Sequence, residues 1–163
     1  NMAEDKLFTG LKSFTGTRRR FELKGEVSGV KVIDDYGHHP TEIIATLTAA
    51  KNLAQSARVL VIFQPHRYSR TAAFFEQFSA ALSNADFTFL LEVYAASEKA
   101  IPGVSSMMIA RNMDQSKVKF EPSMLEVVSE ITKMAKSGDV IITLGAGDIS
   151  SLGEPILQSL ASR

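Results

Sequence analysis

The chain has 163 residues, of which 45% are hydrophobic and 22% are charged, the composition of one soluble globular domain. Eighteen Lys and Arg balance eighteen Asp and Glu, and this zero net charge argues against nucleic acid or a membrane surface as a partner. The absence of cysteine excludes disulfides and thiolate metal sites. No apolar run approaches the roughly 20 residues that span a bilayer. We therefore expect a cytoplasmic domain.

The first segment of the chain carries no clear periodicity. Asn1 before Met2 suggests an expressed fragment, with residues 1–16 as a linker or fragment boundary. Residues 19–27 alternate loosely between apolar and polar side chains, which predicts a strand with a polar face. A short apolar strand is expected over residues 30–34. These two strands are expected to form a hairpin at the edge of a sheet.

Strands and helices alternate through the rest of the chain. Apolar runs predict buried strands over residues 59–63, 87–91 and 140–144, with a short strand over 118–120. Apolar residues at helical spacing predict helices over residues 40–54, 71–82, 107–112, 123–136 and 149–160. The helix over 123–136 is expected to bury Leu125, Val128, Ile131 and Ala135.

This alternation predicts a three-layer, Rossmann-like α/β domain, in which helices flank a mainly parallel sheet on both faces. Ligands of such sheets bind beyond the carboxyl ends of the strands. We therefore expect functional residues just after Ile33, Phe63, Leu91 and Leu144.

A first polar cluster follows the expected strand over residues 30–34. It places two carboxylates, a phenol and two imidazoles ahead of a helix N-terminus: Asp34, Asp35, Tyr36, His38 and His39. An aspartate here can accept hydrogen bonds from ribose hydroxyls, and Tyr36 can lie against a base ring. Either histidine can donate to an anion near the positive end of the helix. The alternative is that the aspartates are helix caps and the tyrosine is packing.

A second cluster follows residues 59–63 and contains His66, Arg67 and Arg70. Arginine presents a planar fork of donors that grips a carboxylate or phosphate through two hydrogen bonds. We expect Arg67 and Arg70 to form an anion site, again at a helix N-terminus. The alternative is that one or both arginines pair with surface acids.

A third cluster, Gly145-Ala146-Gly147-Asp148, is interpreted as a tight turn beside a ligand pocket. It is not a dinucleotide fingerprint, because Ser150 holds the last glycine position of G-x-G-x-x-G. The chain also lacks a G-x-x-x-x-G-K-[ST] phosphate loop and a G-x-S-x-G nucleophile elbow. A metal site made from the histidines and aspartates is disfavoured, because adjacent histidines point apart and no HExxH is present.

Longer motifs resemble the Mur ligase family, in particular the ligases that join L-alanine to UDP-N-acetylmuramate. The specific pair is DDYGHHPTEI (residues 34–43) followed by VIFQPHRYSRT (61–71). FTGTRRRFELKG (14–25), IPGVSS (101–106) and TLGAGDI (143–149) support it in the family's order. The resemblance implies that residues 1–163 are only the C-terminal domain. The N-terminal UDP-sugar domain and the central domain with the ATP phosphate loop are then absent, and the isolated chain is expected to be inactive.

The resemblance also implies an ATP-dependent ligase of peptidoglycan precursor synthesis that works through an acyl phosphate. By this resemblance Asp34, Asp35 and Tyr36 bind the nucleotide, with Asp35 at the ribose. His38, Arg67 and Arg70 would surround the carboxylate of L-alanine. Mg²⁺ would be held mainly by the central domain, so no metal ligand is expected here.

Two alternatives remain open. A sibling ligase attaches a recycled tripeptide to the same sugar nucleotide and shares the DDxxHHPT pattern, although QPHRYSRT is typical of the alanine enzyme. The other alternative is a stand-alone nucleotide- or anion-binding module without catalysis.

Overall fold

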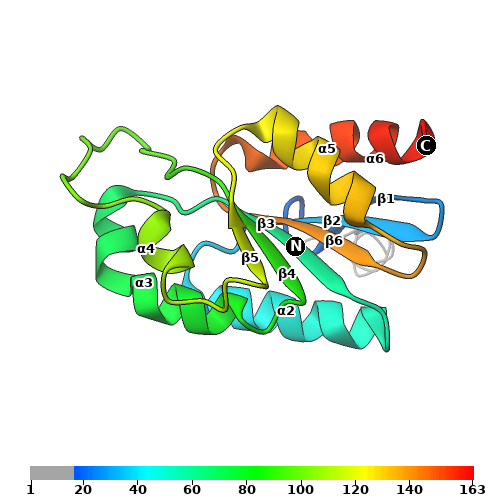
Figure 1. The fold of residues 1–163 in the computed structure, drawn as a ribbon, viewed down its shortest axis with the longest axis horizontal. Coiled ribbons are helices and arrows are strands. Elements are labelled where there is room, and N and C mark those ends of the chain that lie inside the picture. Colours follow the sequence, from blue (N-terminus) through cyan, green and yellow to red (C-terminus); the bar gives the residue numbers. More distant parts are fainter. Residues whose placement is uncertain (1–16) are drawn as a thin grey trace, which may run out of the picture.

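The computed structural model describes residues 17–163, so the expected linker over residues 1–16 lies outside the described residues. A six-stranded sheet lies between two layers of helices (Figure 1). The strands are β1 (Glu22–Val27), β2 (Val30–Asp35), β3 (Val59–Phe63), β4 (Phe87–Leu90), β5 (Val118–Phe120) and β6 (Val140–Leu144). The helices are α2 (Pro40–Ala54), α3 (Tyr68–Leu82), α4 (Met107–Ala110), α5 (Met124–Met134) and α6 (Gly153–Ala161), with a 3-10 turn η1 (Asp148–Leu152). Every helix in this part of the chain is too short or too polar to cross a bilayer.

The strand order is β1-β2-β6-β3-β4-β5, and of these strands only β1 runs antiparallel to its neighbour. This confirms the predicted Rossmann-like fold with a hairpin at one edge of the sheet. Because β6 lies between β2 and β3, the carboxyl ends of the three strands meet. Asp35 pairs with Leu144, and Leu144 pairs with Phe63. The three polar clusters that follow these residues are therefore neighbours.

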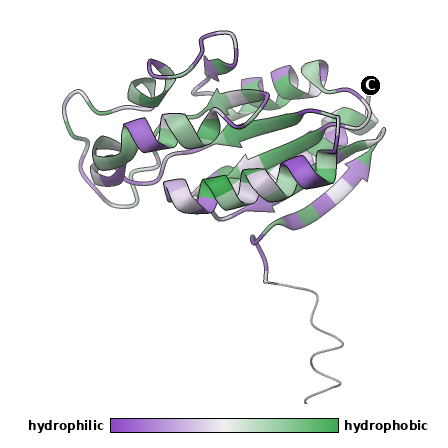
Figure 2. Ribbon diagram, turned by 90° about the horizontal axis from the view of Figure 1, so that it is seen from below, coloured by the Kyte–Doolittle hydropathy of each residue, from purple (hydrophilic) through white to green (hydrophobic). Residues whose placement is uncertain are grey.

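Two hydrophobic cores cover the two faces of the sheet. Helices α2, α3 and α4 pack on one face, and α5, η1 and α6 pack on the other (Figure 1). Successive side chains of a strand point to opposite faces of the sheet and therefore into different cores. Ile33 lies in the first core and Val32 in the second. Figure 2 shows hydrophobic central strands and a more polar edge strand β1. The helical stripes expected in α2, α3 and α6 are confirmed as buried, through Ile43, Leu47, Phe78, Leu82, Ile156 and Leu160.

The strand expected over residues 19–27 is shorter than its pattern indicates. Arg19 and Phe21 have left-handed backbone φ angles of 58° and 48°, and β1 begins at Glu22. The last expected helix, over 149–160, also divides into η1 and α6. Both differences arise near the carboxyl ends of the strands, where side chains from other elements hold the backbone.

Helix α3 begins at Tyr68 rather than at the expected Thr71. Glu98, from the loop after β4, accepts a hydrogen bond of 3.0 Å from the Ser69 amide and another of 2.6 Å from the Ser69 hydroxyl. A carboxylate at this position satisfies a free amide of the first turn and compensates the positive end of the helix. Because this cap comes from a distant segment, the local sequence does not reveal it.

The expectation that Leu125 faces the core is wrong, since the residue is 80% exposed. Helix α5 buries Val127, Val128 and Ile131, and Met124 packs partly against the same core. One apolar stripe of a surface helix faces inward, and in its first turn Met124 takes that position. Leu125 lies outside the stripe.

Candidate functional site

The site is formed by three segments at the carboxyl ends of the central strands. We call residues 34–39 the acidic loop, residues 64–71 the arginine segment and residues 145–148 the glycine turn. The acidic loop comprises the last two residues of β2 and the turn after it, the arginine segment follows β3, and the glycine turn follows β6 between them. Segments that lie far apart in the chain are therefore adjacent where the sequence predicted ligand binding.

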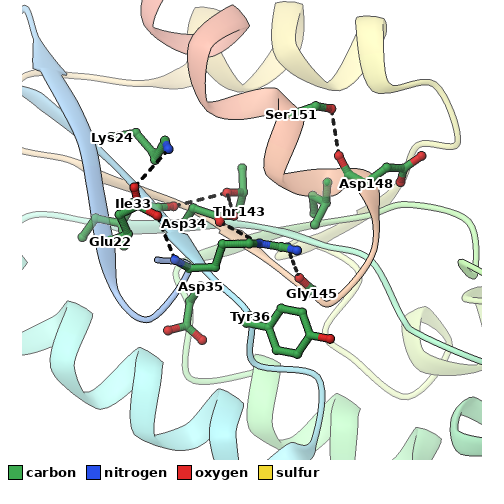
Figure 3. A network of polar contacts seen from close by, with 12 residues as sticks. Glu22, Lys24, Ile33, Asp34, Asp35, Tyr36, Thr143, Gly145, Asp148 and Ser151 are labelled. Carbon is green, nitrogen blue, oxygen red and sulfur yellow. Dashed lines mark hydrogen bonds and ion pairs between the residues drawn. The ribbon is translucent and has the colours of Figure 1, made fainter. Parts of the chain in front are cut away.

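Asp34 is 1% exposed, and both of its carboxylate oxygens are bound within the protein. Arg19 Nε donates to Oδ2 at 3.0 Å, and the Thr143 hydroxyl donates to Oδ1 at 2.8 Å (Figure 3). Asp34 and Thr143 are cross-strand partners in β2 and β6, so their side chains share one face of the sheet. The buried charge of Asp34 is thus compensated by one arginine.

Asp35 is 5% exposed and accepts three hydrogen bonds. The Gly37 amide (2.8 Å) and the Thr46 hydroxyl of α2 (3.0 Å) bind Oδ1, and the Phe21 amide (2.7 Å) binds Oδ2. Because an added Cβ at Gly37 would lie 2.8 Å from Asp35 Oδ1, this tight approach requires glycine. Asp35 therefore joins the acidic loop to α2 and to the segment that precedes β1.

Tyr36 is partly buried, and cationic and aromatic groups surround its ring. The guanidinium carbons of Arg19 and Arg20 lie 5.0 and 5.5 Å from the ring centroid. The His38 ring meets it edge-on at 5.2 Å. An aromatic ring held by nearby cations is a stable platform for contact with another flat group.

The two histidines of the acidic loop have different positions. His39 is the N-cap of α2, and its ring packs against Phe74 at 5.1 Å, on the side of the α2–α3 contact. His38 instead lies in the site, where its Nδ1 is 3.0 Å from the Tyr36 carbonyl. Of the two histidines that the sequence offered, the structure places His38 beside the arginine segment.

Glu42 completes the cap of α2. Its Oε2 accepts the amides of His38 at 3.0 Å and His39 at 3.1 Å. Burial alone would raise the pKa of Glu42, but these amide bonds and nearby positive charge lower it below its ordinary value. The capping box therefore holds the acidic loop in place with an ionised carboxylate.

Arg67 is exposed and Arg70 is partly buried at the start of α3. Arg70 Nη1 lies 3.3 Å from the His66 carbonyl and 3.4 Å from His66 Nδ1. Among residues 17–163, no Asp or Glu forms an ion pair with either arginine. Pairing with surface acids, the alternative in the sequence, is not observed in the described part of the chain.

His66 connects the arginine segment to the rest of the site. Its ring stacks on Tyr94 with a centroid distance of 5.6 Å and an interplanar angle of 15°, and lies 5.8 Å from the His38 ring. Burial lowers the pKa of His66 below its ordinary value, and neighbouring positive charge, chiefly that of Arg70, lowers it further. Since arginine can only donate, His66 Nδ1 faces it as an acceptor. The neutral imidazole then carries its proton on Nε2.

The glycine turn packs closely against the other segments. Gly145 has a φ of 149°, and an added Cβ would lie 2.7 Å from the Gln64 carbonyl. At Gly147 an added Cβ would lie 2.4 Å from Gln64 Oε1 and 2.8 Å from Tyr94 Cγ. Gln64 also donates to Asp148 Oδ1 at 2.8 Å. Glycine is needed here for close packing between strands, in agreement with the tight turn that the sequence predicted.

Three residues of this arrangement were not nominated from the sequence: Arg19, Tyr94 and Glu98. Gln64 lies in the second polar cluster, which the sequence placed directly after a buried strand. Tyr94 and Glu98 lie in a loop without periodicity, and Arg19 was read as part of a strand. Within residues 17–163, no group of three or more His, Asp or Glu side chains is placed to hold a metal ion.

These features make a receptor for an anion beside an aromatic platform. Two guanidinium groups that have no carboxylate partner among residues 17–163 and a histidine of lowered pKa lie at the N-terminus of α3. The carboxylates of the acidic loop are bound by donors from the protein itself. The site can therefore bind and orient a negatively charged group.

Comparison with known proteins agrees with this arrangement. A family model described as Mur ligase, glutamate ligase domain, matches residues 19–147. A UDP-N-acetylmuramate–L-alanine ligase from Renibacterium salmoninarum is 45% identical over 158 residues, which cover 97% of this chain and 34% of that protein. The chain spans about a third of the length of the curated relatives it matches.

Solved structures give the same result. A UDP-N-acetylmuramate-alanine ligase from Thermotoga maritima superimposes with a TM-score of 0.77 at 27% identity, covering 99% of this chain and 34% of that one. A single domain from Haemophilus ducreyi, assigned to a UDP-N-acetylmuramate:L-alanyl-gamma-D-glutamyl-meso-diaminopimelate ligase, has a TM-score of 0.67 at 26% identity and covers 87% of this chain and 100% of that one. The chain therefore belongs to the Mur ligase family, whose C-terminal domain it matches in sequence and in fold.

Proposed function

We propose that this domain is the C-terminal part of a ligase that joins L-alanine to UDP-N-acetylmuramate in peptidoglycan precursor synthesis. ATP transfers its γ-phosphoryl group to the muramate carboxylate, which gives an acyl phosphate and ADP. The amine of L-alanine attacks the acyl carbon, and phosphate leaves as the amide forms and the amine loses a proton. The domain closes over ATP and holds the amino acid in position for this attack.

The observation that carries the proposal is the pair of arginines at the start of α3 that have no carboxylate partner among residues 17–163. The only fixed negative charge of L-alanine is its carboxylate. Arg67 and Arg70, with His38 and neutral His66 beside them, offer donors to such a group. Fixing the carboxylate there turns a bimolecular attack into a positioned one, and it limits repulsion with the phosphate.

On the nucleotide side the proposal assigns Asp34, Asp35 and Tyr36. The Tyr36 platform suits contact with a base or ribose. Asp35 Oδ2 accepts one hydrogen bond, from the Phe21 amide, so one lone pair remains for a ribose hydroxyl. Asp34 is bound to Arg19 and Thr143 and supports the loop from the other face of the sheet.

The proposal requires further domains. UDP-N-acetylmuramate, the ATP phosphates and Mg²⁺ would be held by N-terminal and central domains of the same protein, and the isolated domain would not catalyse. We place the complete enzyme in the cytoplasm, where ATP is available. The 34% share of the Renibacterium relative that this chain covers supports the need for the remaining domains.

The experiment is a comparison of amino substrates on the full-length ligase. With UDP-N-acetylmuramate and ATP present, we expect phosphate release that depends on L-alanine and is not supported by L-alanyl-gamma-D-glutamyl-diaminopimelate. Preference for the tripeptide would instead assign the domain to the sibling ligase, of which the Haemophilus ducreyi domain is an example. The Renibacterium salmoninarum relative, an L-alanine ligase that is 45% identical over 97% of this chain, favours L-alanine. If neither amino substrate supports phosphate release, only the stand-alone binding module remains.

A further inference from the structure

Helix α3 begins at a residue that cannot cap it. Arg67 occupies the N-cap position, where its side chain makes no hydrogen bond to the free amides of the first turn. A guanidinium can only donate, whereas these amides need an acceptor. In α2 and α5 the N-cap residues, His39 and Ser123, accept from their own first turns. The start of α3 therefore needs an acceptor from elsewhere in the chain.

Glu98 supplies this acceptor from the loop after β4. Its Oε2 accepts the Ser69 amide at 3.0 Å, and its Oε1 accepts the Ser69 hydroxyl at 2.6 Å. These bonds lower the pKa of Glu98 below its ordinary value, so the capping group is an ionised carboxylate. Both oxygens are bound to serine, and within residues 17–163 neither forms an ion pair with Arg67 or Arg70.

The main chain before Glu98 is bound to the arginine segment. We call residues 94–98 the latch. The Tyr94 amide donates to the Pro65 carbonyl at 2.8 Å, and the Tyr94 carbonyl accepts the Arg67 amide at 2.8 Å. These bonds form a parallel bridge between Tyr94 and His66, whose rings also stack. The latch therefore contacts the arginine segment on both sides of His66.

Unfavourable backbone angles occur on both sides of this contact. Ala96 and Ser97 have left-handed φ angles of 49° and 70°, and the Glu98 amide closes the turn on the Ala95 carbonyl at 3.0 Å. Arg67, which the latch contacts, has a φ of 76°. Residues with a Cβ keep such conformations where surrounding contacts determine them, and they cluster at functional sites. The turn brings the Glu98 carboxylate to the helical turn that follows Arg67.

The two arginines flank the residue that Glu98 binds. Arg67 precedes Ser69 by two positions, and Arg70 follows it directly. Helix ends fray, and their free amides need partners. Loss of the cap would loosen the first turn of α3, and both guanidinium groups would then lose their fixed positions.

We propose that Glu98 is a positioning residue for the amino substrate: it caps α3 in place of Arg67 and so holds Arg67 and Arg70 where the substrate carboxylate binds. The inference rests on the proposed function, which supplies that carboxylate. Glu98 does not touch substrate in this scheme and acts through Ser69. Because a carboxylate from the latch caps the helix, both arginine side chains remain for the substrate.

Asp114 provides a matched control at the amino ends of the strands. Its carboxylate accepts the Ser116 amide at 2.9 Å and the Ser116 hydroxyl at 2.7 Å, the same two groups of a serine that Glu98 binds. These bonds lower the pKa of Asp114 as well. Asp114 lies in the turn before β5, whereas the site lies beyond the carboxyl ends of the strands. The two acids therefore differ in location and not in the kind of bond.

The first measurement is steady-state kinetics of the full-length ligase. We expect Glu98→Ala to raise the KM for L-alanine on the order of 10-fold and to leave the KM for ATP within about 2-fold, because the lost cap serves one substrate. Glu98→Gln keeps one acceptor oxygen and should raise the KM for L-alanine by an intermediate factor. Asp114→Ala should change each KM by less than about 2-fold.

A double substitution tests whether Glu98 acts through Ser69. Ser69→Ala alone removes the hydroxyl bond and should raise the KM for L-alanine by about 3-fold. In the Glu98→Ala background the same change should have an effect below about 1.5-fold, because its partner is already gone. Equal effects in the two backgrounds would overturn the route through Ser69.

Hydrogen exchange in the 163-residue chain gives a readout that is independent of catalysis. The Ser69 amide should exchange faster in Glu98→Ala than in the unsubstituted chain, and at an unchanged rate in Asp114→Ala. If Glu98→Ala does not fold, Glu98→Gln takes its place in each measurement, with the same expected split between the two KM values.

The proposal is overturned if the two KM values rise equally, if the Ser69 amide exchanges at an unchanged rate, or if the KM for L-alanine stays the same or falls in Glu98→Ala. A fall would mean that the charge of Glu98 only repels the substrate carboxylate. Failure of the proposed function has a different signature. The unsubstituted ligase would then show no alanine-dependent phosphate release, while the Ser69 amide would still exchange faster in Glu98→Ala and not in Asp114→Ala.

Discussion

Asp34 and Asp35 are consecutive in β2, and their carboxylates bind partners on opposite faces of the sheet. Asp34 meets Thr143 and Arg19 (Figure 3), whereas Asp35 meets Thr46 of α2. Adjacent strand residues point in opposite directions, so the two acids cannot grip one ribose as a pair. Each instead fastens a different layer of the domain to the acidic loop.

Replacing Asp35 tests its double role. Asp35→Ala removes the acceptor of three donors, two of them the amides of Phe21 and Gly37, and should lower the free energy of unfolding by about 3 kcal/mol. Urea unfolding of the 163-residue chain measures this. Asp114→Ala, an exposed control that loses only two local bonds to Ser116, should cost less than about 1 kcal/mol.

In the full-length ligase we expect Asp35→Ala to weaken ATP use more than alanine use, and equal loss would remove Asp35 from the nucleotide pocket.

Arg70 is expected to hold the substrate carboxylate. Arg70→Ala in the full-length ligase should raise the KM for L-alanine and lower turnover, by a combined factor on the order of 10 to 1000, because a charged clamp is lost. Steady-state kinetics with varied alanine measures both. Arg163→Ala is the control, since Arg163 binds the Ala135 carbonyl at the opposite end of the sheet. An unchanged alanine KM in Arg70→Ala would contradict the assigned role.

Gly147 lies where the glycine turn meets Tyr94. Gly147→Ala places a methyl group 2.8 Å from the Tyr94 ring and closer still to Gln64, so the ring must move away from His66. We expect a stability loss of about 1–3 kcal/mol from overpacking and a higher KM for L-alanine. Thermal unfolding and kinetics measure these effects. The matched control is Gly153→Ala, where the new methyl meets only the Lys24 side chain at 3.1 Å in a helical backbone, and stability should be unchanged or slightly higher.

The lowered pKa of His66 gives stability a defined pH dependence. Between that lowered pKa and the ordinary value of about 6.5, the unfolded chain binds a proton at His66 that the folded chain does not. The contribution of neutral His66 to the free energy of unfolding is therefore fully present above about pH 6.5. It is lost as the pH falls toward the pKa of His66 in the folded chain. Urea unfolding at several pH values should show this loss for the unsubstituted chain relative to His66→Asn. A pH-independent difference between the two would refute it.

A bound anion should raise the lowered pKa of His66. A carboxylate beside Arg70 neutralises the positive charge that disfavours the imidazolium of His66. In the full-length ligase with L-alanine added, NMR titration should report a higher His66 pKa than in its absence.

Thr88 is a buried residue whose hydroxyl has no hydrogen-bond partner among residues 17–163. Thr88→Val removes a desolvated polar group from β4 at nearly constant shape, and stability should rise by about 1 kcal/mol. Thr143→Val is the counterpart, because Thr143 donates to Asp34 at 2.8 Å, and it should lower stability by about 1–3 kcal/mol. Urea unfolding of both variants measures the change in the free energy of unfolding. A change of the same sign in both variants would be inconsistent with this difference in bonding.

Much of the fold could be predicted from local pattern. The apolar runs of β3 and β6 and the stripes of α2 and α6 are local signals with the correct period, and each became the expected buried element. The strand-end rule then placed the three polar clusters at one edge of the sheet. These inferences succeed because periodicity records which face of an element avoids water.

The partners of the polar side chains came only from tertiary structure. Nothing in the order of residues indicates that Glu98 caps α3, that Arg19 reaches Gly145, or that Tyr94 stacks on His66. Such contacts join segments far apart in the chain, and hydrogen bonds are directional, so they form only after packing has set distance and angle. The sequence by itself determined which chemical groups gather at the strand ends. The tertiary structure decided which of them neutralise one another, as Arg19 and Asp34 do, and which have no such partner in the described chain, as with Arg67 and Arg70.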